Sequence, residues 1–108
     1  MSNEKPCVLL VDDDAAVRTV LAALLRQGGI EAIEAASASE ALTFLNDGVT
    51  DVMVTDLRMP GMDGMELLAR ASKTWPDVPV IMLTAHGNVP LAVEAMRQGA
   101  FEFLLKPF

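Results

Sequence analysis

The sequence of 108 residues contains a single cysteine, Cys7, and no apolar run long enough to cross a membrane. One cysteine excludes a disulfide within the chain and favours a reducing compartment, so we expect a cytoplasmic protein. The apolar runs at 8–11, 52–54 and 80–83 have four residues or fewer, whereas a membrane-spanning helix needs about 20. Residues 1–6 include Glu4 and Lys5 and no apolar stretch, which argues against a secretory signal.

Positive charge is also scarce, and it is not clustered. Lys and Arg together number 8, Asp and Glu number 15, and the formal net charge is −7 at pH 7. Nucleic-acid backbones recruit basic surfaces, so we expect no direct nucleic-acid binding by this domain. With 52% hydrophobic and 21% charged residues and no linker-like segment, the chain has the composition of one folded domain.

The sequence alternates short β-rich runs with helical patterns. Apolar residues recur at helical spacing after residue 14, and Gly28 ends that pattern. Three further helices are predicted to begin at Ser37, Asp63 and Asn88, which have the side chains of helix N-caps. The predicted strands are 8–11, 30–35, 51–55, 78–83 and 101–105.

Strands that alternate with helices predict an α/β fold with a parallel sheet covered on both faces. Right-handed crossovers and five strands favour a doubly wound, flavodoxin-like sheet with strand order 2-1-3-4-5. In such sheets ligands bind outside the carboxyl ends of the strands. The residues that follow or end the strands there are Asp12, Asp13, Asp56, Thr84 and Lys106.

The chemistry of these residues suits a cation and a phosphoryl group. Carboxylates crowded into one cleft must take up protons or bind a cation. Few oxygen ligands favour Mg²⁺ over Ca²⁺, which needs a fuller cage. Lys106 and Thr84 could neutralise and hydrogen-bond an incoming oxyanion. Taken alone, an aspartate row before a helix is more often an N-cap, and we expect that role for Asp14.

Four stretches together resemble the bacterial response-regulator receiver domains, most closely the receivers of NtrC-type and FixJ-type transcriptional regulators. They are LVDDD at 10–14, DLRMPGMDG at 56–64, TAHG at 84–87 and KPF at 106–108. The resemblance covers nearly the whole chain. It implies that Asp56 accepts a phosphoryl group from a phosphohistidine of a sensor histidine kinase. It also implies that Asp13, Asp56 and the backbone carbonyl of Arg58 ligate Mg²⁺, with Asp12 acting through water.

The same resemblance assigns roles to residues near the end of the chain. Thr84 and Lys106 would grip the phosphoryl oxygens, and the Lys106–Pro107 peptide bond would be cis. Phe103 matches the switch aromatic of the family, whose rotamer couples to Thr84.

Two more positions, Arg58 and His86, correspond to sites thought to tune self-dephosphorylation in the family. A role as ordinary solvated loop residues is an equal alternative for both. The domain would be a signalling switch and not an enzyme, because it would catalyse only its own phosphoryl transfer and slow self-dephosphorylation. The switch would control an output domain with an ATPase, a helix-turn-helix DNA-binding module or both, and so regulate transcription.

Family members continue past Phe108 into a fifth helix, so we expect 1–108 to be a receiver domain truncated before that helix. Its absence should leave one face of the first and fifth strands poorly covered, at some of the residues Val8, Leu10, Phe103 and Leu105. We expect another copy of the chain to cover this face, giving a dimer.

Two functions of other classes fit the sequence less well than a receiver does. A Mg²⁺-dependent phosphatase of the haloacid-dehalogenase class also uses an aspartate nucleophile, and Asp12 and Asp14 supply its Asp-x-Asp pair. Ala16, however, stands where that class has Thr or Val. A nucleotide-binding module is disfavoured because no Gly-rich loop follows the first strand. A degenerate receiver used only for contacts is disfavoured by the presence of Asp56, Thr84 and Lys106.

Overall fold

The structure is a computed structural model that describes residues 5–85 and 87–106. Strands and helices alternate along these residues, as the sequence predicts. The elements are β1 (Cys7–Val11), α1 (Ala15–Gln27), β2 (Glu31–Ala35), α2 (Ala38–Asn46), β3 (Val52–Thr55), α3 (Gly64–Thr74), β4 (Val80–Thr84), α4 (Val89–Arg97) and β5 (Glu102–Leu105).

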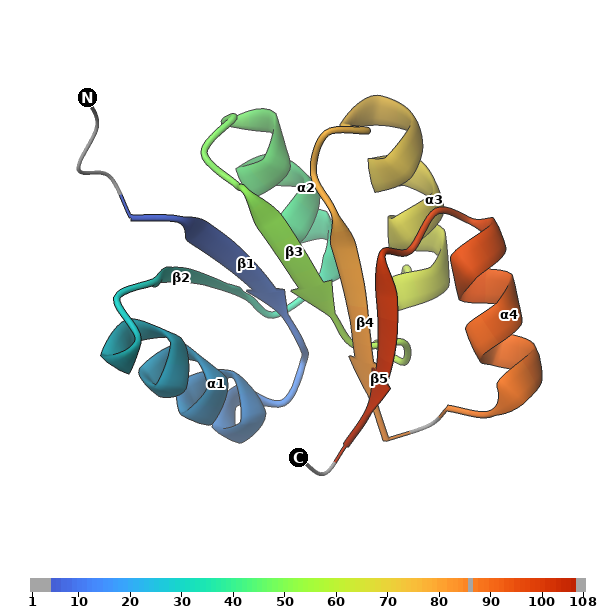
Figure 1. Ribbon diagram of the computed structural model, residues 1–108, viewed down its shortest axis with the longest axis horizontal. Coiled ribbons are helices and arrows are strands. Elements are labelled where there is room, and N and C mark those ends of the chain that lie inside the picture. The colour runs from blue at the N-terminus through green and yellow to red at the C-terminus, as the bar shows by residue number, and fades with distance from the viewer. Residues whose placement is uncertain (1–4, 86, 107–108) are drawn as a thin grey trace.

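The strands form one parallel sheet in the order β2-β1-β3-β4-β5, which confirms the predicted doubly wound α/β fold. All five arrows run toward the same edge of the sheet, so their carboxyl ends lie together (Figure 1). The winding direction reverses beside β1, because β2 lies on one side of it and β3 on the other. A parallel sheet of this kind offers its ligand site at that edge.

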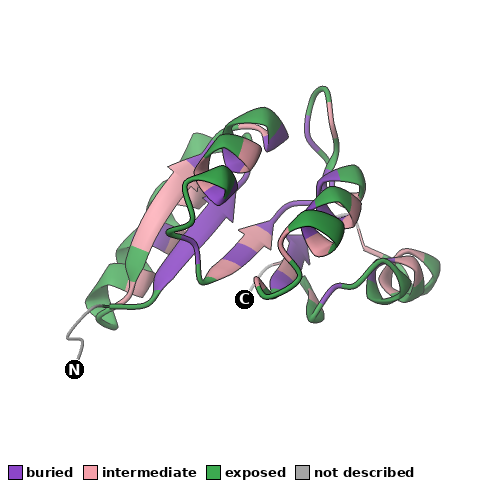
Figure 2. Cartoon of the chain, turned by 90° about the horizontal axis from the view of Figure 1, so that it is seen from above, coloured by how far each residue is buried: buried purple, intermediate pink, exposed green. Residues whose placement is uncertain are grey.

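Two apolar clusters lie on opposite faces of the sheet. One joins Leu9, Val11, Met53 and Met82 to the side chains of α2, α3 and α4. The other joins Val8 and Leu10 to Ala22, with Leu21 and Leu25 of α1 packed against it. Burial is concentrated in the central strands, whereas the outer sides of the helices are exposed (Figure 2). Within the described residues no helix is long and apolar enough to cross a membrane.

All four predicted helix N-caps are present. The side chains of Asp14, Ser37, Asp63 and Asn88 each accept a hydrogen bond from a backbone N–H in the first turn of the following helix. Glu40 returns a bond as in a capping box, but its carboxylate accepts from the backbone N–H of Ala36 and not from Ser37 itself. Each cap satisfies N–H groups that would otherwise lack partners inside the helix.

Four strands begin later than the sequence predicts, β2, β3 and β5 by one residue and β4 by two. Strand β4 begins at Val80 and not at Val78, because the Val78 N–H donates to the Trp75 carbonyl in the turn after α3. The next residue, Pro79, has no N–H to contribute to a ladder. Strand β5 begins at Glu102, and Phe101 lies just outside it with 69% of its surface exposed.

Exposure of apolar side chains differs from the prediction at the first strand and agrees with it only in part at the fifth. Val8 and Leu10 are buried, because α1 covers the face to which they point. In β5 Leu105 is 54% exposed, but it lies on the same face as Phe103, which packs against the larger core. Leu104, which the prediction did not include, lies on the α1 face and is 47% exposed.

Candidate functional site

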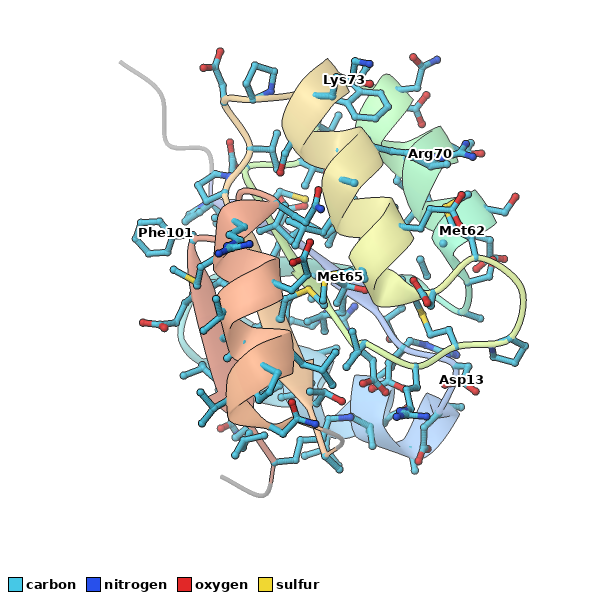
Figure 3. The ribbon with its side chains drawn as sticks, turned by 90° about the vertical axis from the view of Figure 1, so that its right-hand side faces the viewer. Asp13, Met62, Met65, Arg70, Lys73 and Phe101 are labelled. Carbon is cyan, nitrogen blue, oxygen red and sulfur yellow. The ribbon has the colours of Figure 1, made fainter. Side chains whose placement is uncertain are left out.

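Three carboxylates meet at the carboxyl edge of the sheet. Asp12 and Asp13 follow β1, Asp56 follows β3, and one carboxylate oxygen from each lies within 4.8 Å of the others. Asp12 and Asp56 are buried, whereas Asp13 is exposed. Figure 3 shows Asp13 beside the start of α1 and next to the loop between β3 and α3. The cluster therefore has a buried floor and one arm that faces solvent.

Lys106 supplies positive charge to this cluster from the end of β5. Its Nζ donates to Asp12 Oδ2 at 2.8 Å and lies 3.7 Å from Asp56 Oδ2. Burial alone would lower the pKa of the Lys106 ammonium. The hydrogen bond with Asp12 and the negative charges of Asp56 and Asp12 together outweigh this effect of burial, so the pKa of Lys106 is raised.

The three consecutive aspartates have different surroundings. Asp12 Oδ1 accepts from the backbone N–H of Asp14 at 2.9 Å, while its Oδ2 faces Lys106. Asp14 turns away and caps α1 by accepting from the N–H groups of Ala16 and Val17. The side chain of Asp13 makes no hydrogen bond or ion pair with any residue that the structure describes. Asp13 is thus the member of the row that is open to a ligand.

Asp56 is fixed by its own backbone surroundings. Its N–H donates to the Val11 carbonyl at 2.9 Å, which extends the pairing of β1 and β3 by one residue. Its Oδ1 accepts from the N–H of Leu57 at 2.7 Å, and its carbonyl accepts from the Thr55 hydroxyl at 3.0 Å. The carboxylate therefore has one oxygen held by the backbone and one, Oδ2, directed toward Lys106.

Gly64, the first residue of α3, allows the chain to pass closely over Asp56. A Cβ at this position would lie 1.9 Å from the Asp56 carbonyl oxygen and 2.9 Å from the Leu57 Cα. Both neighbours are backbone atoms that cannot rotate aside. Only glycine fits, so the start of α3 is held against the end of β3.

Thr84 ends β4 and is fully buried. Its carbonyl accepts the backbone N–H of Lys106 at 2.9 Å, which ties the carboxyl ends of β4 and β5 together. Phe103 lies in β5 opposite Met82, with its ring against Gly87, where an added Cβ would lie 2.7 Å from Phe103 Cε1. Thr84 and Phe103 are therefore placed on adjacent strands.

The remaining predicted residues lie at the rim of the site or outside the described part of the chain. Arg58 is exposed in the loop between β3 and α3. His86 and the Lys106–Pro107 peptide bond lie outside the described residues.

Sequence reasoning missed Arg18, which the structure places beneath the aspartate row. Its side chain is 16% exposed, and its Nη1 donates to the Asp12 carbonyl at 2.5 Å. The spacing of four from Asp14 indicates at most a surface ion pair on a helix. No sequence signal pointed to a bond with the backbone of Asp12.

The donor set fits a hard divalent cation. Three carboxylate oxygens within 4.8 Å of one another are the ligand type that Mg²⁺ prefers. The exposed side of Asp13 leaves room for the water ligands that Mg²⁺ retains. By contrast, a groove of about 480 Å³ between the carboxyl-terminal ends of α2 and α3 contains Arg70 and Lys73 but no carboxylate. Figure 3 shows Lys73 at the far end of α3 from Asp13.

Comparison with known proteins agrees with this geometry. The family model described as the response regulator receiver domain matches residues 8–108. The transcriptional regulatory protein GlrR of Escherichia coli K12 is 46% identical over 107 residues, which are 99% of this chain and 24% of GlrR. The DNA-binding transcriptional regulator NtrC of Klebsiella pneumoniae is 43% identical over 99 residues, 92% of this chain and 21% of NtrC.

A solved structure, the crystal structure of FixJ-N, aligns with a TM-score of 0.86 and 44% sequence identity, covering 97% of this chain and 84% of FixJ-N. The chain thus spans less than a quarter of the length of these two curated regulators but most of the FixJ-N structure. These matches decide against the phosphatase alternative, and they confirm the resemblance to NtrC-type and FixJ-type receivers. The chain belongs to the response regulator receiver domain family, a family of signalling switches in two-component systems.

Proposed function

We propose that this receiver is switched by phosphorylation of Asp56 in a Mg²⁺-dependent reaction with a sensor histidine kinase. The observation that carries the proposal is the meeting of Asp12, Asp13, Asp56 and Lys106 from three strand ends at one edge of the sheet. In this arrangement anionic ligands for a metal lie beside an anionic nucleophile and a fixed cation. Phosphoryl transfer requires such positioning and charge neutralisation.

In the proposed reaction, a carboxylate oxygen of Asp56 forms a bond to phosphorus as the phosphorus–nitrogen bond of the phosphohistidine breaks. The electron pair of that bond goes to the imidazole nitrogen of the kinase. Asp56 Oδ2 is the candidate for the attacking oxygen, because Oδ1 is held by the Leu57 N–H. An acyl phosphate formed in this way is an established type of covalent intermediate.

Asp13, Asp56 and the Arg58 carbonyl would hold the metal directly in this proposal, and Asp12 would act through water. Mg²⁺, when bound, would neutralise charge on the phosphoryl oxygens. Lys106 already lies within 3.7 Å of the Asp56 carboxylate and would donate to the new phosphoryl group. Thr84, buried at the end of β4, would supply a hydroxyl.

The conformational change on phosphorylation would be transmitted from Thr84 to the ring of Phe103. This ring lies on the neighbouring strand and against Gly87. Arg58 and His86 remain proposed as tuning residues for self-dephosphorylation, and the exposure of Arg58 in its loop is consistent with that role.

The names of the relatives support transcription regulation as the output. GlrR is a transcriptional regulatory protein and NtrC a DNA-binding transcriptional regulator. We propose that an output domain on the same polypeptide, with an ATPase or a helix-turn-helix module, carries that function. The net charge of −7 makes this receiver itself unsuited to nucleic acid. A cytoplasmic location completes the proposal, because a single unpaired cysteine suits a reducing compartment.

The test is phosphorylation of the purified domain by a small phosphodonor with Mg²⁺, followed by intact-mass measurement. We expect one added phosphoryl group in the wild type and none in Asp56→Asn. Asp63→Asn is the matched control, since Asp63 is an exposed cap seven positions along the same segment, and it should be labelled like the wild type. Labelling that persists in Asp56→Asn would refute the assignment of the acceptor.

A further inference from the structure

Arg18 is a cation that the proposed reaction does not use, yet it is among the most enclosed cations of the described residues. Its side chain is 16% exposed, as is that of Lys106, compared with 56% for Arg26 on the same helix. An arginine held this closely loses side-chain entropy and hydration, so its contacts must compensate.

The guanidinium of Arg18 connects three elements. Its Nη1 donates to the backbone carbonyl of Asp12 at 2.5 Å, beyond the end of β1. Its Nε is buried and lies 3.4 Å from Glu34 Oε1 of β2, within ion-pair distance but without hydrogen-bond geometry. Arg18 also lines a small enclosed void of about 10 Å³ together with Asp12, Thr55 and Asp56. The side chain therefore lies directly under the floor of the acidic cluster.

The bond to the Asp12 carbonyl bears on Asp13 through peptide geometry. The Asp12 carbonyl and the Asp13 N–H belong to one planar unit. Fixing that carbonyl fixes the plane from which the Asp13 side chain departs. The carboxylate of Asp12 is already held, by Lys106 and by the N–H of Asp14. None of the described residues forms a hydrogen bond or ion pair with the side chain of Asp13. The direction of the Asp13 carboxylate therefore depends on its backbone.

We propose that Arg18 is a positioning residue of the metal site, which orients the Asp12–Asp13 peptide so that the Asp13 carboxylate faces Asp56. Glu34 in turn holds the guanidinium in the orientation that reaches the Asp12 carbonyl. The inference rests on the proposed Mg²⁺ site and adds a residue to it. Groups that orient metal ligands typically change metal affinity about 10–100-fold when removed.

The charge of Arg18 alone predicts the opposite effect. Removing a cation near three carboxylates would strengthen the binding of Mg²⁺ by Coulomb attraction. A purely structural role, the attachment of α1 to β2, predicts lower stability and unchanged affinity. Positioning predicts weaker binding, so the sign of the change separates the three explanations.

Arg26 provides a matched control within the same helix. Its Nη2 donates to a backbone carbonyl, that of Ala32, at 2.9 Å, and also lies 4.0 Å from Glu34 Oε2. Arg26 therefore has the same residue type, the same acidic partner and the same kind of backbone bond as Arg18. It differs in that its bond does not reach the aspartate row.

The experiment is a Mg²⁺ titration of the domain followed by two-dimensional NMR at the amides of Asp13 and Asp14, with urea unfolding of each variant alongside. We expect about 10-fold weaker Mg²⁺ binding in Arg18→Met and binding within about twofold of the wild type in Arg26→Met. Arg18→Lys should fall between them, because lysine can donate to the Asp12 carbonyl but lacks the fork that also reaches Glu34. The amide resonance of Asp13 should also shift in metal-free Arg18→Met.

Unchanged or tighter Mg²⁺ binding in folded Arg18→Met would overturn the proposal. If Arg18→Met does not fold, Arg18→Lys and Glu34→Gln decide in its place, and affinities equal to the wild type in both would overturn it. A wild-type domain that shows no Mg²⁺-dependent shift at Asp13 would instead refute the proposed metal site, and this inference with it.

Discussion

The ammonium of Lys106 and the carboxylate of Asp12 form an ion pair of 2.8 Å across 94 positions of sequence. The same ammonium lies 3.7 Å from Asp56, so one cation serves two buried carboxylates. Lys106 therefore performs part of the neutralisation that the crowded aspartates require.

Lys106→Met should destabilise the metal-free domain, because it leaves two buried carboxylates without their cation. We expect a loss of about 1–3 kcal/mol in the free energy of unfolding at pH 7. Saturating Mg²⁺ should restore most of this loss, since the metal supplies the missing charge. Urea unfolding with and without Mg²⁺ measures both effects. Lys73→Met, which removes an exposed lysine, should be neutral, and equal losses in the two variants would contradict the prediction.

The neighbouring aspartates Asp13 and Asp14 should separate metal binding from helix stability. Asp14→Ala removes the N-cap of α1 and should cost about 1 kcal/mol of stability with little change in Mg²⁺ affinity. Asp13→Ala removes an exposed carboxylate that has no side-chain partner within residues 5–85 and 87–106, and it should change stability by less than about 0.5 kcal/mol. It should weaken Mg²⁺ binding by at least about 10-fold. Calorimetric titration and thermal unfolding of both variants check the pair, and a larger effect of Asp14→Ala on Mg²⁺ affinity would reverse the assignment.

Stability should fall in alkaline solution partly through Cys7. Burial, together with the charges of Glu31 and Asp51, raises the pKa of the Cys7 thiol above its ordinary value of 9.0. A group whose folded pKa is raised contributes stability below its unfolded pKa and loses it as pH rises through the folded pKa. The stability of the wild type relative to Cys7→Ala should therefore be constant from pH 6 to about pH 8 and decline above about pH 9. Urea unfolding across this range tests the prediction, and a relative stability that rises with pH would contradict it.

Leu104 should take part in self-association of the domain. Leu104 pairs with Leu83 on the sheet face that α1 covers in part, and 47% of its surface is exposed. Val20 and Leu24 of α1 are also exposed, at 57% and 54%. Leu104→Gln should lower the apparent molecular mass measured by light scattering at high protein concentration. Val49→Gln, at an exposed valine in the loop before β3, should leave it unchanged. A wild type that stays monomeric at every concentration would remove the basis for this expectation.

The order of the strands is one of the common orders for this alternation, and the meeting of Asp12, Asp56 and Lys106 could be predicted because a parallel sheet brings carboxyl ends together. The N-caps were predictable for a local reason, since the capping side chain and the backbone N–H groups that donate to it are a few residues apart. Two features were not predictable. The burial of Leu10 depends on how far α1 extends over β1, and the role of Gly64 depends on a close approach to the Asp56 carbonyl.

Arg18 shows the same limit at the site itself. Its partners are a backbone carbonyl and a glutamate of another strand, and neither leaves a mark in the local sequence around residue 18. Every residue type has a backbone carbonyl, so a contact with one does not restrict the residue type at that position. A search of the sequence for complementary side chains therefore does not find such a contact. Such a residue is found only when the positions of α1 and β2 are known.

The order of the clustered residues along the chain has a consequence for biosynthesis. A ribosome makes Asp56 and the aspartate row long before Lys106, which lies beyond β5. Until Lys106 has left the exit tunnel, the nascent chain carries its three acidic groups without the cation that neutralises two of them. The acidic cluster of this receiver therefore reaches its charge balance only in a polypeptide that has been synthesised past that lysine.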